Sequence, residues 1–269
     1  MSSDVAAVCT GLVKIYRTAT GDVHALKGID AVFPARTVTA IVGPSGSGKS
    51  SLLRILAALD RPTAGSMQVG DVTVSALGRS SLRGIRRRMV GYVFQRPGHN
   101  LIPHLTVRQH VALAARLRGS QDRRAIDDLL RLLGLEQRLR HRPHQLSGGE
   151  QQRVAFAQAV VGNPPLVVAD EPTAELDSAT GERLLEAVAS LTSLGASFVV
   201  STHDPRVVAA ATRTLHLRHG ALEAETEHRR LSVIDEAGRI QLPPSALRLF
   251  GERRAVIEVE EDHVRIEPP

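Results

Sequence analysis

The sequence predicts an α/β fold built on a parallel sheet with helices on both faces. Three short runs are rich in apolar and β-branched residues and lack polar alternation, which is typical of strands buried on both faces. They lie at residues 38–42, 166–169 and 198–201, and helical stretches separate them along the chain. Each run ends in glycine-rich or polar residues. Because ligands bind at the carboxyl ends of parallel strands, a site is expected along that edge of the sheet.

The first run is followed at once by a glycine-rich loop and a predicted helix at 49–56. The loop satisfies the pattern G-x-x-x-x-G-K-[ST] in the context that the pattern requires, between a strand and a helix. Glycine accepts positive φ, so backbone N–H groups can turn toward phosphate oxygens, and the helix N-terminus adds its dipole. We expect Lys49 to neutralise the β- and γ-phosphates of a nucleotide and Ser50 to bind Mg²⁺. The predicted phosphate loop comprises Gly43, Pro44, Ser45, Gly46, Ser47, Gly48, Lys49, Ser50 and Ser51.

Two adjacent acids end the second run. Asp170 follows the apolar residues directly, where a carboxylate suits Mg²⁺, and Glu171 is the next residue. Glu171 is expected to reach the water that attacks the γ-phosphate. Two neighbouring buried acids are costly without a cation, which favours a metal-linked role over ordinary strand-end acids.

The remaining segments predict an inserted helical lobe and a short C-terminal unit. Residues 108–134 have helical periodicity, and so does the stretch at 181–194. A polar, charged stretch at 225–230 has the composition of a linker. The residues beyond it are too few to bury a stable core without the main domain or a partner. Their expected elements are strands at 231–234, 239–242, 255–259 and 263–266 and a helix at 245–250.

The overall composition excludes several classes of protein. The 269 residues are 42% hydrophobic and 23% charged, which is ordinary for a globular chain and unlike a disordered or collagen-like one. No apolar run approaches the ~20 residues of a membrane-spanning helix, and the N-terminus has no apolar core of a signal peptide. The single cysteine, Cys9, cannot form an internal disulfide and is expected to be a buried apolar residue. These features predict a cytoplasmic protein.

The net charge of +6 raises the question of nucleic-acid binding. Aromatic residues make up only 3% of the chain and tryptophan is absent, so platforms for base stacking are scarce. The densest basic cluster, Arg83 with residues 86–88, is expected to be a solvated helix face. Five histidines lack the supporting carboxylates or cysteines of a metal site, and none is expected there: His99, His104, His110, His141 and His144.

The segment at 146–153, Leu-Ser-Gly-Gly-Glu-Gln-Gln-Arg, resembles the signature motif of ATP-binding-cassette (ABC) ATPases. The resemblance implies a P-loop NTPase fold with a parallel-sheet core, an antiparallel β subdomain and a helical subdomain at about 96–160. The ATPase domain would span 1–225 and the small β-rich extension 226–269. In this family the signature motif faces the phosphate loop of a second subunit, so a head-to-tail homodimer encloses two ATP molecules. The signature residues here are Ser147, Gly148, Gly149 and Glu150.

Four further positions match the family in order along the chain. Tyr16 resembles the aromatic residue that stacks on adenine. Gln95 resembles the glutamine that senses Mg²⁺ and the attacking water, and that couples the site to the membrane partner. Asp177 resembles the aspartate of the loop that crosses the dimer interface, and His203 the histidine that contacts the γ-phosphate. The implied catalytic residues are Glu171, His203, Gln95 and Lys49. The implied Mg²⁺ ligands are Ser50, Gln95 and Asp170.

Residues 23–30 and 171–178 look most like the bacterial group that includes lipoprotein-release, macrolide-export and cell-division ATPases, and the match covers residues 8–223. This resemblance implies Mg²⁺-dependent ATP hydrolysis that energises a separate integral membrane permease. The ATPase would be peripheral on the inner face of the cell membrane. An alternative within the same resemblance is a non-transport ATPase that regulates cell-wall hydrolases through a membrane partner.

The C-terminal extension resembles an AbrB-type swapped-hairpin domain, on the residues 233–243, 247–251 and the strands up to 266. Members of that family dimerise by exchanging strands and often bind DNA. Residues 228–269 contain seven arginines and no lysine against two aspartates and six glutamates. DNA-binding modules concentrate positive charge, so this balance favours a dimerisation or docking role over nucleic-acid binding. A regulator that acts on DNA through this extension is the third hypothesis for the function of the chain.

Overall fold

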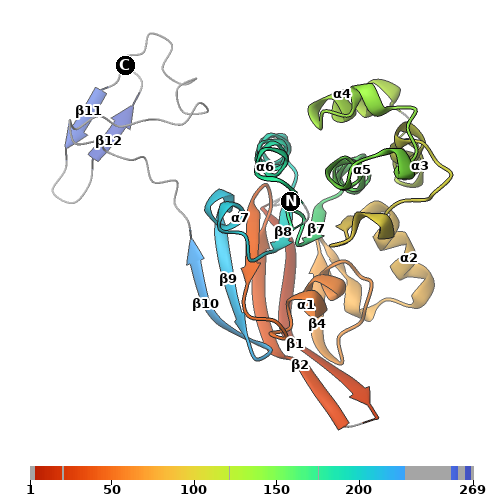
Figure 1. Cartoon of the computed structure of the whole chain (residues 1–269). Helices are drawn as coiled ribbons and strands as arrows, with labels where there is room; N and C mark the ends of the chain where they lie inside the picture. The colour runs from red at the N-terminus through yellow and green to blue at the C-terminus, as the bar shows by residue number, and fades with distance from the viewer. Residues whose placement is uncertain are drawn as a thin grey trace. The chain divides into compact units, whose positions relative to one another are not determined.

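The computed structural model describes residues 4–19, 21–120, 122–174, 176–227, 256–259 and 264–267 (Figure 1). The chain divides into two units, Met1–His228 and Arg229–Pro269. In the second unit, β11 (Val256–Val259) pairs antiparallel with β12 (Val264–Glu267), close to two of the predicted strands. The other predicted elements of the extension, at 231–234, 239–242 and 245–250, lie outside the described residues.

The main sheet of the first unit has the strand order β10-β9-β3-β8-β7-β6 in the described part of the chain. Every neighbouring pair is parallel except β9 with β10, which is antiparallel. The three strands predicted from apolar runs are confirmed as β3, β7 and β8, and they are adjacent. The bounds are β3 Val38–Val42, β6 Val90–Val93, β7 Leu166–Asp170, β8 Phe198–Ser201, β9 Arg213–Arg218 and β10 Ala221–Glu227.

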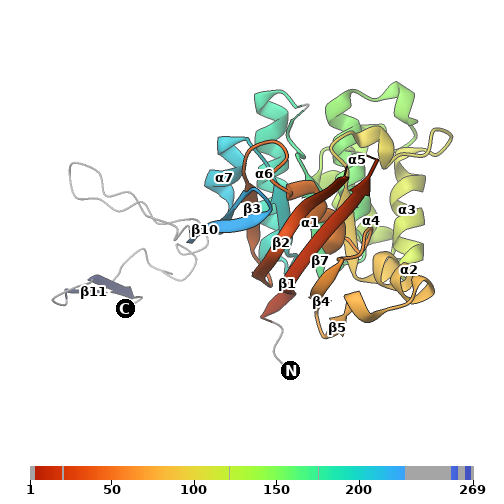
Figure 2. The same ribbon diagram turned by 90° about the horizontal axis from the view of Figure 1, so that it is seen from below.

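A second, antiparallel sheet has the order β2-β1-β4-β5. Helix α1 (Lys49–Leu56) lies between the two sheets, and its apolar side chains share one core with residues of β1, β2, β7 and β8 (Figure 2). Leu52, Leu53 and Ile55 are fully buried there. The helix is therefore held from both sides with its first turn at the edge of the main sheet. The strands are β1 Val5–Thr18, β2 Gly21–Pro34, β4 Ala64–Val69 and β5 Val72–Thr73.

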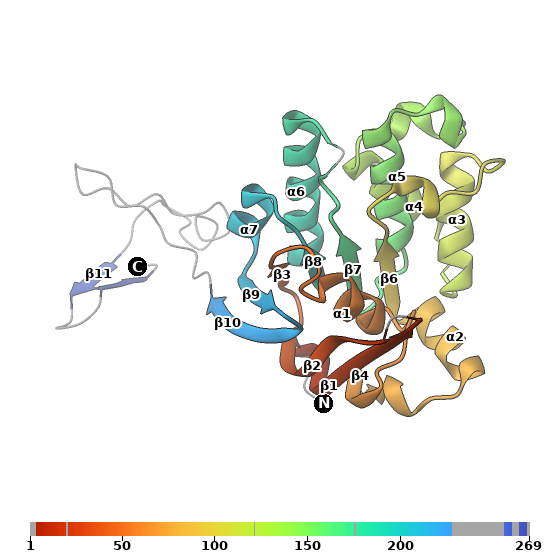
Figure 3. The same ribbon diagram turned by 60° about the horizontal axis from the view of Figure 1, so that its bottom comes forward.

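The helices α3, α4 and α5 form a lobe set apart from α6 and α7 (Figure 3). The stretch predicted as helical at 108–134 is two helices, because Gly119 takes φ +85° and the side chain of Asp122 accepts hydrogen bonds from the first turn of α4. None of the described helices has the length and apolar character needed to cross a membrane. The α-helices are α2 Arg79–Arg88, α3 Val107–Leu117, α4 Arg123–Leu132, α5 Gly148–Val160, α6 Ser178–Ser193 and α7 Pro205–Ala210. The 3-10 helices are η1 Val74–Ala76, η2 Pro97–His99, η3 Glu136–Arg138 and η4 Pro143–Gln145.

One arginine connects this lobe to the main sheet. The guanidinium of Arg118, at the end of α3, donates to the carbonyl oxygens of Gln158 at 2.6 Å and Val161 at 2.8 Å. It also donates to the carbonyl oxygen of Val90 at the start of β6, at 3.3 Å. Burial lowers the pKa of Arg118 to about 10, so the group stays charged at neutral pH. A charged donor thus satisfies carbonyls at the end of α5 that have no partner within the helix.

We expect Arg118→Met to lower the free energy of unfolding by about 2 to 4 kcal/mol, because buried carbonyls lose a charged donor while the apolar stem is kept. The matched control is Arg116→Met on the same helix, where the side chain is exposed and the change should stay within about 0.5 kcal/mol. Urea unfolding followed by circular dichroism measures both. Equal losses in the two variants would contradict this role of Arg118.

Candidate functional site

The phosphate loop runs from the end of β3 to the first turn of α1. Gly48 caps the helix with φ +103°, and a Cβ there would lie 2.4 Å from the carbonyl oxygen of Ala25. Gly43 has φ +154°, and a Cβ there would lie 2.0 Å from the carbonyl oxygen of Leu217. Both positions therefore require glycine for backbone conformation and for space.

The polar groups of this loop fit a phosphate chain. The ammonium of Lys49 donates to the carbonyl oxygens of Gly43 at 2.7 Å and Pro44 at 3.0 Å, so it lies across the loop. The side chain of Ser47 is buried, and its hydroxyl has no hydrogen-bond partner among the described residues. Ser50 is exposed on the first turn of α1. A cation, an unpartnered hydroxyl and a helix N-terminus together suit an anionic ligand.

The two predicted acids lie at the end of β7. Asp170 is the last residue of the strand, and its Oδ1 accepts a hydrogen bond from the hydroxyl of Ser201 on β8. The N–H of Glu171 donates to the carbonyl oxygen of Ser201 at 3.0 Å. Glu171 has φ +47°, a conformation that costs a non-glycine residue about 1 kcal/mol or more. Such strain is typical of functional sites.

Glu171 and His203, predicted separately from the sequence, are in direct contact. The Nδ1 atom of His203 lies 2.9 Å from Oε2 of Glu171, and the backbone N–H of His203 donates to the same oxygen at 3.3 Å. The Glu171 side chain is 13% exposed, whereas the His203 side chain is 76% exposed. The hydrogen bond and the negative charge of Glu171 raise the pKa of His203. The pair places a carboxylate and a titratable cation at the strand ends.

The signature residues begin α5 and are held by their own hydrogen bonds. The N–H of Glu150 donates to Oγ of Ser147 at 3.2 Å, and the N–H of Ser147 donates to Oε2 of Glu150 at 2.8 Å, which is a capping box. Arg138 donates to the other carboxylate oxygen at 2.7 Å. Partial desolvation acts to raise the pKa of Glu150, but the hydrogen bonds from Ser147 and Arg138 outweigh it and lower this pKa. Ser147 and Gly148 are left exposed at the helix start.

Asp177 begins α6 in a similar way. Its carboxylate accepts from the N–H of Thr180 at 2.9 Å and from the Thr180 hydroxyl at 2.7 Å, and these hydrogen bonds lower the pKa of Asp177. A Cβ on Gly149 would lie 2.9 Å from Cγ2 of Thr180, so the starts of α5 and α6 pack closely together. The two segments that resemble dimer-interface elements are therefore fixed against each other within one chain.

Gln95 is exposed two residues beyond β6, the strand next to β7. The side chain of Asn100 holds this segment, because it accepts from the N–H of Phe94 at 2.9 Å and donates to the carbonyl oxygen of Tyr92 at 2.8 Å. Asn100 was not among the residues predicted from the sequence. Its only local signal is a polar residue among turn-forming neighbours.

Tyr16 has contacts away from the phosphate loop. Its hydroxyl donates to Asp60 at 3.0 Å, and the ammonium of Lys14 lies 4.8 Å from the centre of its ring. Lys14 also forms an ion pair with Asp60 at 2.8 Å. One face of the Tyr16 ring is thus occupied by the ammonium of Lys14.

The structure brings the phosphate loop, Asp170, Glu171 and His203 to the carboxyl ends of the adjacent strands β3, β7 and β8. It adds Ser201, which the sequence analysis treated only as part of a buried run. It also adds Asp204, which caps α7, forms an ion pair with Arg206 at 2.8 Å and accepts from Thr173 at 2.9 Å. The Arg206 guanidinium holds the pKa of Asp204 at about 2. An Asp directly before Pro205 is a recognisable helix-start signal.

No group of three or more histidines, cysteines and acids suited to a metal ion is found among the described residues. His110 is buried, with Nδ1 lying 2.8 Å from the carbonyl oxygen of Thr106 and Nε2 accepting from the N–H of Ile102 at 2.8 Å. Burial lowers its pKa. Both ring nitrogens are therefore used by the backbone. Cys9 is buried as expected, and burial raises the pKa of its thiol to about 12.

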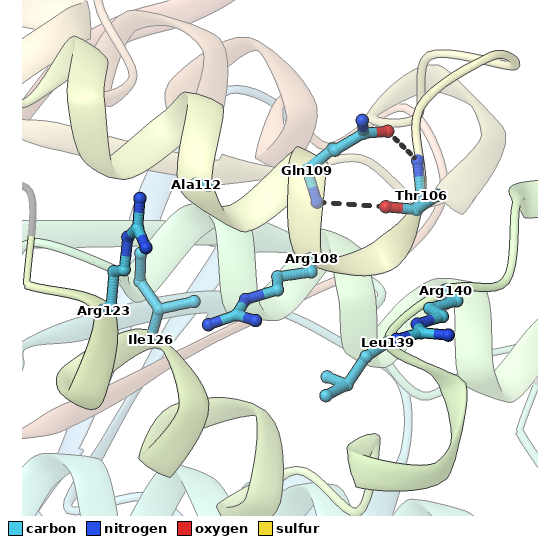
Figure 4. Close-up of a pocket in the computed structure, with 8 residues that line it drawn as sticks. All are labelled: Thr106, Arg108, Gln109, Ala112, Arg123, Ile126, Leu139 and Arg140. Atoms are coloured by element: carbon cyan, nitrogen blue, oxygen red, sulfur yellow. Dashed lines mark hydrogen bonds between the residues drawn. The ribbon is translucent and has the colours of Figure 1, made fainter.

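A pocket of about 490 Å³ lies in the helical lobe, away from these strand ends (Figure 4). Three of its lining residues are arginines, and one of them, Arg108, forms an ion pair with Asp127 at 2.8 Å. None of the predicted site residues lines it. Its residues are Thr106, Arg108, Gln109, Ala112, Arg123, Ile126, Leu139 and Arg140.

Residues 26–174 match the family model described as ABC transporter. The chain is 40% identical over 210 residues to the macrolide export ATP-binding/permease protein MacB of Shigella flexneri, covering 77% of this chain and 32% of that protein. It is 38% identical over 226 residues to the lipoprotein-releasing system ATP-binding protein LolD of Legionella pneumophila, covering 82% of this chain and 99% of that protein. A dimeric structure of the ABC transporter cassette MJ0796 of Methanocaldococcus jannaschii is similar, with TM-score 0.77, 36% identity and coverage of 84% and 100%. A second dimeric structure of that cassette is a post-hydrolysis state bound to ADP and Pi.

We expect the pKa of His203 to lie above the ordinary histidine value of ~6.5 and to fall in Glu171→Gln, because the partner charge is removed. Since the folded-state pKa is raised, this contact stabilises the fold below the ordinary value, and its contribution is lost as the pH rises through the raised value. Histidine NMR titration, assigned with His203→Gln, measures the shift. Asp177→Asn is the control and should leave the His203 titration in place. An unchanged His203 pKa in Glu171→Gln would contradict the contact.

Proposed function

Because this chain belongs to the ABC transporter family of ATP-binding proteins, we propose that it hydrolyses Mg²⁺-ATP within a head-to-tail homodimer and thereby drives a separate membrane permease. The observation that carries the proposal is the contact between Glu171 and His203 at the strand ends where the phosphate loop also lies. A carboxylate beside a loop that fits phosphates is the arrangement required for attack of water on a terminal phosphate.

Nucleotide binding is assigned to the phosphate loop and to Tyr16. Backbone N–H groups of residues 45–51 cradle the phosphates, and the Lys49 ammonium turns from the loop carbonyls to the β- and γ-phosphate oxygens. The face of the Tyr16 ring opposite Lys14 would stack on the base. Ser47 supplies a buried hydroxyl that a phosphate oxygen would satisfy.

Glu171 is assigned as the group that orients or deprotonates the attacking water. Its low exposure and its contact with His203 hold the carboxylate in one place. His203, with its raised pKa, donates to the γ-phosphate as negative charge develops there. The work of the site is mainly positioning and charge neutralisation.

The residues present also fit Mg²⁺, which prefers oxygen ligands and retains water. The hydroxyl of Ser50, the amide oxygen of Gln95 and the carboxylate of Asp170 would hold it. When bound, the ion neutralises charge on the β- and γ-phosphate oxygens.

A second copy of the chain completes each site in this proposal. Ser147 and Asp177 are exposed, yet each is fixed by a helix cap, which suits residues that must meet a partner surface in one geometry. The dimeric structures of the similar cassette MJ0796 support a dimer here. Glu150, with both carboxylate oxygens engaged, positions Ser147 for the nucleotide of the other subunit.

The permease is assigned from relatives, since MacB is named as an ATP-binding/permease protein and LolD as the ATP-binding protein of a lipoprotein-releasing system. The chain would then act as a peripheral subunit on the inner face of the cell membrane, with Gln95 coupling the site to the permease. The ATPase domain is assigned to 1–225, with its helical subdomain at about 96–160, and the tail at 226–269 to dimerisation or docking.

We expect Glu171→Gln to bind ATP but to hydrolyse it about 10²- to 10⁴-fold more slowly, because the water loses its base while the nucleotide contacts remain. The ATP-bound variant should accumulate as a dimer. Phosphate release and size-exclusion chromatography with ATP measure the two effects.

Glu182→Gln is a suitable control, since it makes the same chemical change at an exposed position on α6. It should leave turnover and oligomeric state at the wild-type values. Wild-type turnover in Glu171→Gln would contradict the catalytic assignment.

A further inference from the structure

Ser201 and Asp170 occupy matching positions at the ends of neighbouring parallel strands. In the pairing of β7 with β8, Asp170 lies opposite Ser201. Laterally paired residues of a sheet project from the same face, so the two side chains point the same way. This is the face that packs on α1, since Val168 and Val199, two residues earlier in each strand, share a core with that helix.

The Ser201 hydroxyl contacts both acids of the site. It donates to Oδ1 of Asp170, and its oxygen lies 3.3 Å from the N–H of Glu171 as an acceptor. Ser201 is fully buried, so water does not compete for either contact. A hydroxyl has one proton to donate, and here the Asp170 carboxylate takes it.

We propose that Ser201 is a positioning residue that fixes the Asp170 carboxylate for divalent-cation binding, which rests on the proposed function of this site. The terminal torsion of an aspartate is broad, so an unheld carboxylate samples many orientations. A hydrogen bond to Oδ1 selects one of them and leaves Oδ2 for the metal or its water. Within the described residues no protein donor reaches Oδ2.

The contact with Glu171 extends the positioning role of Ser201 along the chain. The Glu171 N–H is shared between the carbonyl oxygen and the hydroxyl oxygen of Ser201. These contacts help to hold Glu171 at its positive φ, from which its side chain reaches His203. Ser201 thus sets the relative orientation of the metal-binding acid and the water-activating acid.

A purely structural role for Ser201 makes a different prediction. If the residue only filled space, any side chain of the same shape would serve equally. Ser201→Thr keeps the hydroxyl and Ser201→Val removes it, while both add similar volume at the same buried position. The pair therefore separates hydrogen bonding from packing.

The test measures metal binding apart from turnover. Mn²⁺ is titrated into the non-hydrolysable ATP analogue AMPPNP with and without the full chain. Free Mn²⁺ is read from its electron paramagnetic resonance signal, and the difference between the two titrations gives the Mn²⁺ held by the chain. We expect Ser201→Thr to bind Mn²⁺ within about twofold of wild type and Ser201→Val to bind about tenfold more weakly, as for loss of a hydrogen bond to a charged group. Thermal unfolding of each variant checks that the fold is kept. If Ser201→Val does not fold, Ser201→Ala replaces it, with the same weakening expected.

Equal Mn²⁺ affinity in Ser201→Thr and the variant without the hydroxyl would overturn the proposal. This holds even if the wild-type chain hydrolyses ATP, because the proposed function could then be correct without this role of Ser201. Equal weakening in both variants would also overturn it, because packing would then explain the effect. Failure of the proposed function would look different: the wild-type chain would release no phosphate from Mg²⁺-ATP, and it would hold no Mn²⁺ beyond that bound by AMPPNP alone.

Discussion

The lateral register of the parallel strands is the constraint on which the site depends. In that register β8 pairs with β3 on one side and with β7 on the other, and Ser201 lies opposite both Ile41 and Asp170. The phosphate loop, the two acids and His203 therefore leave the sheet from one edge. A slip of β7 by one residue would turn Asp170 to the opposite face of the sheet. The buried apolar faces on both sides of the sheet prevent such a slip, so the hydrophobic core fixes the relative positions of these residues.

A second constraint acts at the starts of α5 and α6. Each helix is capped by a side chain that the family resemblance also places at the dimer interface, Ser147 in α5 and Asp177 in α6. The Ser147 and Asp177 side chains each accept a hydrogen bond from one otherwise free N–H group of the first turn, which fixes the start of each helix. The absence of a side chain at Gly149 lets Thr180 approach closely and joins the two starts. One chain can thus present a preformed surface to another, in keeping with a site that two copies share.

Local sequence patterns predicted the strands and helices whose own residues have a distinctive composition or motif. The strands β3, β7 and β8 are continuous apolar runs, and α1 follows a loop with a recognisable phosphate-binding pattern. The antiparallel sheet was not predicted from the residues themselves, because register shifts in β1, such as that between Cys9 and Leu12, break the alternation that marks a half-buried strand. The contact of Ser201 with Asp170 could not be predicted either, since the two residues are 31 positions apart and meet only through strand pairing. Residues that carry a sequence motif could be predicted as candidate site residues, whereas Ser201, whose role depends on a lateral neighbour, could not.

In the proposed function, each ATP is hydrolysed between the phosphate loop of one chain and the signature residues of another. The most direct measurement is ATP turnover after mixing two inactive variants before nucleotide is added. Lys49→Ala removes the loop cation, and Ser147→Asp keeps a good helix cap but places a negative charge against the phosphates. In a head-to-tail heterodimer of these chains, one site has an intact loop and an intact signature. We expect the mixture to regain a substantial part of wild-type turnover although neither variant hydrolyses ATP alone. No recovery in the mixture, or wild-type turnover by Ser147→Asp alone, would contradict it.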